Sequence, residues 1–164
     1  MWMAEPVSPL RLLFVCTGNT CRSPMAEARA RAWAAAEGLE AVVFESAGTS
    51  AAEGAPASDP AVRVAAAGGL DLSTHRSRQL TADLVRTADL VIAMTARHGA
   101  EVARIDPDAL VILATSALPD GHPGRGQDLP DPFGGDDAVY QSTWDSICES
   151  VEALLATISR KRSG

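Results

Sequence analysis

The sequence predicts an α/β fold: a single doubly wound domain with a central four-stranded parallel sheet and helices on both faces. Apolar runs of strand length alternate with stretches of helical character, in the order expected for strand–helix–strand units. The strand candidates are apolar at successive positions, as in a parallel sheet covered on both sides. The chain has 164 residues, enough for one hydrophobic core, and shows no internal repeat or linker. We therefore expect one domain over residues 10–160, preceded by a flexible extension over residues 1–9.

The first strand is expected over residues 10–15, where apolar side chains follow one another almost without a break. A helix is expected over residues 24–37. Ser23 suits the N-cap, Pro24 suits the first helical position, and Gly38 suits the position just past the helix end. The first strand therefore leads into the first helix through a short loop.

The remaining strands are expected over residues 41–45, 88–94 and 110–114. One helix should begin at Asp59-Pro60 and end at Gly68, and another should lie around residues 96–105. In an open parallel sheet, ligands bind at the carboxyl ends of the strands. The loop after the first strand should therefore lie at the binding edge.

The C-terminal quarter combines one long irregular segment with one long helix. Residues 115–136 are rich in Gly, Pro and Asp, and a loop of that length usually has a function or is disordered. The helix after it carries an apolar face at steps of three and four, formed by Tyr140, Trp144, Ile147, Val151, Leu154 and Ile158. Cys148 falls on the flank of that face, which indicates a structural role.

Residues 16–22 read Cys-Thr-Gly-Asn-Thr-Cys-Arg, directly after the first strand. The backbone N–H groups after Cys16 can surround a tetrahedral oxyanion, and the guanidinium of Arg22 matches two phosphate oxygens. The helix start adds the positive end of its dipole. This environment favours the thiolate of Cys16, which is the nucleophilic form, over a buried and inert cysteine. The motif therefore predicts a loop that binds a phosphate group and attacks it.

The segment Cys16-Thr-Gly-Asn-Thr-Cys-Arg-Ser-Pro24 resembles the phosphate-binding loop of the low-molecular-weight protein phosphatases. The resemblance covers roughly residues 10–160 and includes matches at residues 46–49, 75–79, 88–95 and 131–135. It implies a cysteine-dependent phosphatase with a phosphocysteine intermediate and no cofactor. Its catalytic residues would be Cys16, Arg22 and Asp131. Its substrate-binding residues would be Thr17, Gly18, Asn19, Thr20, Cys21, Ser23 and Phe133.

Several residues of the motif have predicted supporting roles. Gly18 is expected to let the backbone turn without a side-chain clash, and Asn19 tolerates the left-handed region. The hydroxyl of Ser23 can bond the thiolate while it caps the helix. The resemblance implies that Ser46 and His75 hold Asn19, whereas the sequence alone favours His75 as a polar residue flanking a helix.

Asp131 is the expected general acid, because the leaving group must take a proton when its bond to phosphorus breaks. The same carboxylate can then activate water. Asp-Pro is also common in turns, but of the five aspartates nearby only Asp131 matches the family's Asp-Pro-aromatic motif. Phe133 is expected to form a wall of the pocket.

Thr20 is the clue to the substrate. Many tyrosine-directed relatives carry a larger aliphatic residue there, whereas the arginine-directed branch carries threonine. The tryptophan that often follows the Ser-Ala-Gly segment in tyrosine-directed relatives is absent, and Glu53 lies nearby, where it could favour a cationic side chain. Phosphoarginine is therefore favoured over phosphotyrosine. An arsenate reductase of the thioredoxin-coupled kind would need further cysteines, and an inert binding module would be expected to have lost Cys16 or Asp131.

The three cysteines predict no disulfide framework. Cys21 could resolve an oxidised Cys16 through a reversible disulfide, or simply fill the loop. A reactive thiolate implies a reducing compartment, and residues 1–9 lack the basic region of a signal peptide. The net charge is −7, and the only basic cluster is residues 160–162. We therefore expect a cytoplasmic enzyme that acts on phosphorylated proteins, with no metal, nucleic-acid or membrane partner.

Overall fold

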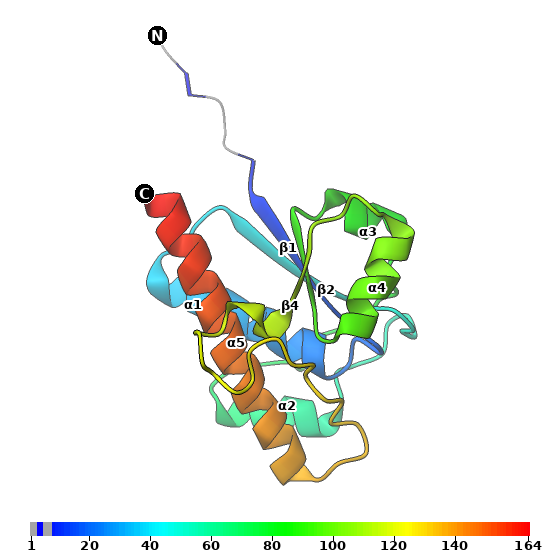
Figure 1. Cartoon of the computed structure of the whole chain (residues 1–164). Coiled ribbons are helices and arrows are strands. Elements are labelled where there is room, and N and C mark those ends of the chain that lie inside the picture. The colour runs from blue at the N-terminus through cyan, green and yellow to red at the C-terminus, as the bar shows by residue number, and fades with distance from the viewer. Residues whose placement is uncertain (1–2, 5–7) are drawn as a thin grey trace.

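The computed structural model of the chain describes residues 3–4 and 8–164 (Figure 1). The predicted extension over residues 1–9 thus lies largely outside the described residues. In the part of the chain that is described, no helix combines the length and the apolar character needed to cross a membrane.

A four-stranded sheet forms the centre of the fold, as predicted, and all of its strand pairs are parallel (Figure 1). The strand order is β2-β1-β3-β4. The strands are β1 (Leu10–Cys16), β2 (Val42–Gly48), β3 (Leu90–Ala93) and β4 (Val111–Leu113). The carboxyl ends of β1 and β2 meet where Cys16 pairs with Gly48.

Helices cover both faces of the sheet, which confirms the predicted doubly wound arrangement (Figure 1). The helices are α1 (Arg22–Glu37), α2 (Asp59–Ala67), α3 (Ala82–Thr87), α4 (Ala96–Ile105) and α5 (Asp137–Ser163), with a short 3-10 helix η1 (Ala114–Ala117) after β4. Residues of α1, α2 and α5 share one core with Leu12 and Phe14 of β1. Residues of α3 and α4 pack on the other face against Leu13 and Val15.

Small side chains bring α1 close to its neighbours. Ala26, Ala30 and Ala34 recur every fourth residue on one face of α1, and all three are buried. That face packs against α5 and the sheet. The start of α1 is therefore held firmly at the end of β1, which fixes the loop between them.

The structure differs from the predicted elements in three respects. Strand β2 continues beyond residue 45 to Gly48, and the short helix α3 was not predicted. The predicted cap role of Ser23 is wrong, because α1 begins at Arg22 with Cys21 at the N-cap and without a side-chain cap bond. The side chain of Ser23 is used inside the loop instead.

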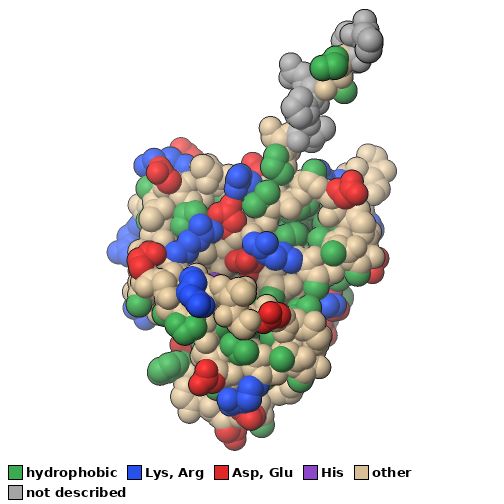
Figure 2. Space-filling model, turned by 180° about the vertical axis from the view of Figure 1, so that it is seen from behind, with side chains coloured by type: hydrophobic (Ala, Val, Ile, Leu, Met, Phe, Trp, Pro, Cys, Tyr) green, Lys and Arg blue, Asp and Glu red, His purple; other side chains and the backbone are tan. Residues whose placement is uncertain are grey.

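Acidic and basic side chains are interspersed on the face turned away from the view of Figure 1 (Figure 2). Among the described residues, opposite charges also pair at short range, as Arg31 does with Glu27 and Arg78 does with Glu45. This face therefore shows no extended patch of one sign.

Gly48 lies where strand β2 passes closest to the loop after Cys16. A Cβ atom at this position would lie 2.4 Å from the carbonyl oxygen of Thr17 and 2.9 Å from the backbone N of Asn19. Backbone atoms cannot move aside as a flexible side chain can. Only glycine therefore allows this strand end and the loop to approach so closely.

We predict that Gly48→Ala destabilises the protein by about 1–3 kcal/mol, because the added methyl group forces the strand end and the loop apart. The free energy of unfolding from denaturant titration measures this change. Gly99→Ala in α4 is the matched control, since a Cβ there would meet only the side chains of Val111 and Ala93, at ordinary distances of 3.6 and 3.8 Å. Equal stabilities of the two variants would contradict the close approach at Gly48.

Candidate active site

The loop over residues 17–21 connects β1 to α1 and surrounds the predicted nucleophile. Cys16 is the last residue of β1 and is almost fully buried. Asn19 has a φ of 56°, in the left-handed region that asparagine tolerates better than most residues. The chain then enters α1 at Arg22. Cys16 and the start of α1 thus lie at the two ends of one tight turn.

The backbone of this loop uses its carbonyl groups and leaves its N–H groups free. Within the described part of the chain, no N–H group of residues 17–21 donates a hydrogen bond. Five carbonyl oxygens accept hydrogen bonds of 2.7–3.2 Å from outside the loop. Four accept from backbone N–H groups: Cys16 from Thr49, Thr17 from Ser50, Thr20 from Ser58, and Cys21 from Met25. The fifth, that of Asn19, accepts from Nε2 of His75. Free N–H donors in a tight loop at a helix start attract an anion. The loop therefore has the chemistry of an oxyanion site.

A cavity of about 240 Å³ opens over this loop. Its lining consists of Cys16, Thr17, Gly18, Thr20, Cys21, Arg22, Asp131 and Phe133. The structure thus brings the three predicted catalytic residues together with most of the predicted substrate-binding residues. Asn19 and Ser23 lie behind the cavity, fully buried.

Arg22 is buried beneath the cavity and is held by the long loop before α5. One terminal nitrogen of its guanidinium donates to the carbonyl oxygen of Leu129 at 2.8 Å. The other lies 3.6 Å from a carboxylate oxygen of Asp131, whose side chain is half exposed at the cavity mouth. Asp131 in turn accepts from the N–H of Phe133 at 3.1 Å. Nothing in the sequence pointed to Leu129 as the partner of Arg22.

Ser23 links the nucleophile to the rest of the loop. Its hydroxyl oxygen lies 2.9 Å from Cys16 Sγ and accepts from the side-chain amide of Asn19 at 2.8 Å. Because the amide donates to this oxygen, the single hydroxyl proton is available to the sulfur. Ser23 can therefore donate a hydrogen bond to a Cys16 thiolate.

Three further contacts hold Asn19, which is completely buried. Its amide also donates to Ser46 Oγ at 2.9 Å, its side-chain oxygen accepts from the N–H of Arg78 at 3.0 Å, and its carbonyl accepts from His75 Nε2 at 2.7 Å. The structure thus places Ser46 and His75 beside Asn19. The sequence analysis missed Arg78.

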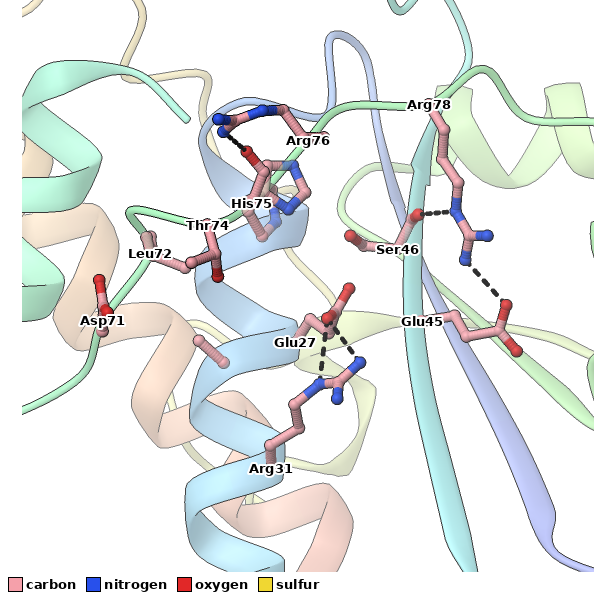
Figure 3. Close-up of a pocket in the computed structure, with 12 residues that line it drawn as sticks. Glu27, Arg31, Glu45, Ser46, Asp71, Leu72, Thr74, His75, Arg76 and Arg78 are labelled. Carbon is pink, nitrogen blue, oxygen red and sulfur yellow. Dashed lines mark hydrogen bonds and ion pairs between the residues drawn. The ribbon is translucent and has the colours of Figure 1, made fainter. Parts of the chain in front are cut away.

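The residues that hold Asn19 also line a cleft of about 480 Å³ between α1, the edge strand β2 and residues 71–78 (Figure 3). The guanidinium of Arg78 reaches the carbonyl of Ser46 at 3.0 Å and the carboxylate of Glu45 at 2.8 Å, as the dashed lines in Figure 3 show. These bonds fix Arg78, and with it the backbone N–H group that donates to the side-chain oxygen of Asn19.

His98 lies beside the loop, and the sequence analysis missed it. Its Nε2 lies 2.8 Å from Thr17 Oγ1, and its Nδ1 lies 2.9 Å from Thr95 Oγ1. Burial, and secondarily the positive charge of Arg22, lower the pKa of His98 to about 4. The only available signal was position, because His98 follows β3, whose carboxyl end lies at the same edge of the sheet as Cys16.

The structure corrects the expectations for Gly18 and Glu53 and shows the contacts of Cys21. Gly18 does not have a positive φ, and a Cβ there would lie an ordinary 3.6 Å from Thr20 Oγ1, so the glycine that the loop requires is Gly48. Glu53 accepts from the N–H of Gln79 and is absent from the cavity lining. The thiol of Cys21 lies 3.2 Å from Ser58 Oγ and 3.4 Å from the hydroxyl of Tyr140 on α5.

The third cysteine lies away from this site. Cys148 is half-buried on α5, where burial raises the pKa of its thiol to about 11. This fits a structural residue. Among residues 3–4 and 8–164, no three His, Cys or carboxylate side chains are grouped so that they could hold a metal ion.

Comparison with known proteins agrees with the geometry of the site. The profile of the family described as low molecular weight phosphotyrosine protein phosphatase matches residues 11–164. The chain belongs to this family. It is accordingly a phosphatase, and the resemblance expected from residues 16–24 is confirmed.

Relatives of two named activities lie within the family. The chain is 39% identical to a protein-arginine-phosphatase of Geobacillus stearothermophilus, over 93% of this chain and 96% of the relative. It is 31% identical to the low molecular weight protein-tyrosine-phosphatase Etp of Escherichia coli K12, over 91% and 95%. The YwlE arginine phosphatase, solved as a mutant with a phosphorylated active-site serine, superposes with a TM-score of 0.85 at 35% identity, over 94% and 99% of the two chains.

We predict that His98 makes the stability of this phosphatase depend on pH between 6.5, the ordinary pKa of histidine, and about 4, its pKa in the folded protein. In that window the unfolded chain binds a proton at this residue that the folded protein does not. The free energy of unfolding should therefore fall with falling pH, by on the order of 1 kcal/mol per unit. Above that window His98 should add no pH dependence.

Denaturant titrations near pH 7 and pH 5 measure this effect. The loss of stability between the two pH values should be smaller for His98→Gln than for the wild type, because glutamine does not titrate. An equal loss in both proteins would show that His98 takes up its proton without penalty in the folded state.

Proposed function

We propose that the protein hydrolyses phosphorylated side chains of proteins through a phosphocysteine intermediate, with phosphoarginine as the favoured group. The observation that carries the proposal is the loop itself. Its free N–H groups, the sulfur of Cys16, the guanidinium of Arg22 and the carboxyl group of Asp131 all adjoin one cavity. These are an oxyanion site, a nucleophile, a charge clamp and an acid within reach of one phosphoryl group.

In the first step, the Cys16 thiolate attacks phosphorus, and the bond from phosphorus to the leaving nitrogen or oxygen breaks. Asp131, protonated, gives its proton to the leaving group. The loop N–H groups and Arg22 stabilise the charge on the phosphoryl oxygens. The relative with a phosphorylated active-site serine supports such a covalent intermediate.

In the second step, Asp131 as a carboxylate takes a proton from water, and the resulting hydroxide attacks phosphorus. The phosphorus–sulfur bond breaks, inorganic phosphate leaves, and the thiolate of Cys16 is restored. The hydroxyl of Ser23 can donate a hydrogen bond to the sulfur of Cys16, so it supports the thiolate both before it attacks in the first step and as it leaves in the second.

Thr20 and the named relatives support phosphoarginine. Thr20 lines the cavity with Asp131, so the pocket offers a hydroxyl and a carboxylate where a guanidinium would lie. Two of the relatives are named protein-arginine-phosphatases, one of them 39% and the other 38% identical to this chain. Rates on matched phosphoarginine and phosphotyrosine peptides test this preference directly.

Phosphotyrosine hydrolysis is the second candidate function. The side chain of Phe133 lines the cavity and is 77% exposed, so its ring is available to stack on a phenol. The description of the family and the Escherichia coli relative also name tyrosine phosphatases.

Both candidate functions place the enzyme in a reducing compartment, and we propose the cytoplasm. Cys16 and Cys21 are free thiols that adjoin the same cavity. The catalytic thiolate must remain reduced for the first step to occur.

We predict that Asp131→Asn slows hydrolysis by about 10² to 10⁴-fold for substrates with poor leaving groups. Aryl phosphates with activated leaving groups should lose far less, because they depart without a proton. The measurement is kcat/KM across a series of leaving groups, with Cys16→Ser as the inactive reference. A uniform loss across the series would assign Asp131 another role.

We predict that Thr20→Ile lowers kcat/KM for phosphoarginine peptides relative to phosphotyrosine peptides by roughly 10- to 200-fold. Isoleucine removes the hydroxyl that a guanidinium would contact and adds apolar surface for a phenol. Both activities are measured in the same variant. Wild-type preference for phosphotyrosine, with parallel changes in both activities, would make this a tyrosine phosphatase.

We predict that peroxide inactivates the enzyme reversibly through a disulfide between Cys16 and Cys21. Peroxide converts the Cys16 thiolate to a sulfenic acid, and the Cys21 thiol then displaces water to form the disulfide. Recovery on adding a thiol should be weaker in Cys21→Ala. Mass spectrometry of the oxidised protein identifies the bridge, and its absence would leave Cys21 as a structural residue of the loop.

A further inference from the structure

His98 is a buried polar side chain that the two-step mechanism does not use. It lies in the first turn of α4 and is only 4% exposed. Both ring nitrogens face hydroxyl groups, those of Thr17 at 2.8 Å and Thr95 at 2.9 Å. A neutral imidazole has one donor and one acceptor, and each hydroxyl can serve either. The ring is therefore fully satisfied by these two contacts.

Thr17 is the residue directly after the nucleophile, and its side chain is exposed. It lines the active-site cavity on one side and a smaller cavity of about 170 Å³ on the other, which His98 also lines. The Thr17 carbonyl accepts from the N–H of Ser50 at 2.9 Å, and its own N–H is one of the free donors of the loop. Apart from the ring of His98, nothing in the described part of the chain bonds the Thr17 hydroxyl.

A comparable contact exists in the middle of the loop. His75 donates to the carbonyl of Asn19, two residues further along the loop. The two histidines come from different segments, one before α3 and one within α4, and they reach the loop on either side of Gly18. The first half of the loop is thus held from outside at two points, Thr17 and Asn19.

We propose that His98 is a positioning residue, which holds Thr17 so that the first N–H groups of the loop face the phosphoryl oxygens. This inference rests on the proposed phosphatase function and adds a residue to it. Without the ring, the Thr17 side chain could turn into the smaller cavity and carry its peptide group with it. A misplacement on the order of 1 Å can cost about 10²-fold in rate.

The test separates positioning from packing. His98→Leu keeps most of the volume and removes both polar atoms, whereas His98→Gln keeps a group that can bond the Thr17 hydroxyl. Val102→Ala is the matched control, because Val102 is a fully buried residue of α4 in the core of the other face and is not part of the loop.

The decisive readout is the ratio of two alkylation rates at Cys16, followed by mass spectrometry at that residue. Iodoacetate carries an anionic carboxylate that the loop can attract, whereas iodoacetamide is a neutral reagent of similar size. Their rate ratio reports anion attraction and cancels changes in the reactivity of the sulfur. We expect His98→Leu to lower this ratio about 10-fold and kcat/KM by about 10- to 100-fold, and His98→Gln and Val102→Ala to keep both near wild type.

Thr17→Val provides an independent arm, because it removes the hydroxyl and leaves His98 in place. It should reproduce the loss seen in His98→Leu, and the double variant should lose no more than either single variant. Additive losses, an unchanged ratio in Thr17→Val, or an equal drop in Val102→Ala would overturn the proposal. A wild-type protein with no phosphatase activity would overturn the proposed function instead, while the alkylation ratio would still decide the role of His98.

Discussion

The loop after Cys16 has to keep its N–H groups free although two of its residues, Asn19 and Cys21, are buried. A buried amide normally finds a partner within secondary structure, so a loop that withholds its donors must be stabilised by other contacts. Here those contacts are made by carbonyl oxygens and side chains, and their partners come from outside the loop: Thr49, Ser50, Ser58, His75 and Met25. The surrounding elements therefore have to bring these donors together around the loop.

The parallel sheet meets that need through its geometry. Because β1 and β2 run in the same direction, their carboxyl ends deliver Cys16 and Gly48 to the same edge, and the residues after β2 can bond the loop after β1. Strand β3 ends at the same edge and leads into α4, which brings His98 to the loop. The long segment before α5 adds Leu129 and Asp131 from another direction.

The residues expected to react could be predicted from the sequence more easily than the residues that hold the loop in place. A strand, a cysteine, an arginine and a helix start are close together in the sequence, so local patterns predict the loop and the fold class. Helix α3 has only six residues and no apolar periodicity of its own, which explains why it was missed. The contacts of Gly48, Arg78 and His98 join segments that are distant in the sequence, so spacing along the chain does not reveal them. The sequence predicted two roles for Ser23, a helix cap and a bond to the thiolate. In the structure its hydroxyl bonds within the loop and does not cap the helix.

The contact between Cys21 and Tyr140 connects the loop to the far end of the chain. Tyr140 is the only tyrosine in the protein, and its hydroxyl lies 3.4 Å from the sulfur of Cys21. Burial, together with the bond to Cys21, raises the pKa of this hydroxyl. A change in the covalent state of that sulfur must therefore alter the surroundings of a single phenol on α5. The protein thus contains its own optical probe: the ionisation of this one phenol, followed by the absorbance of tyrosinate, reports on the loop proposed to bind phosphate.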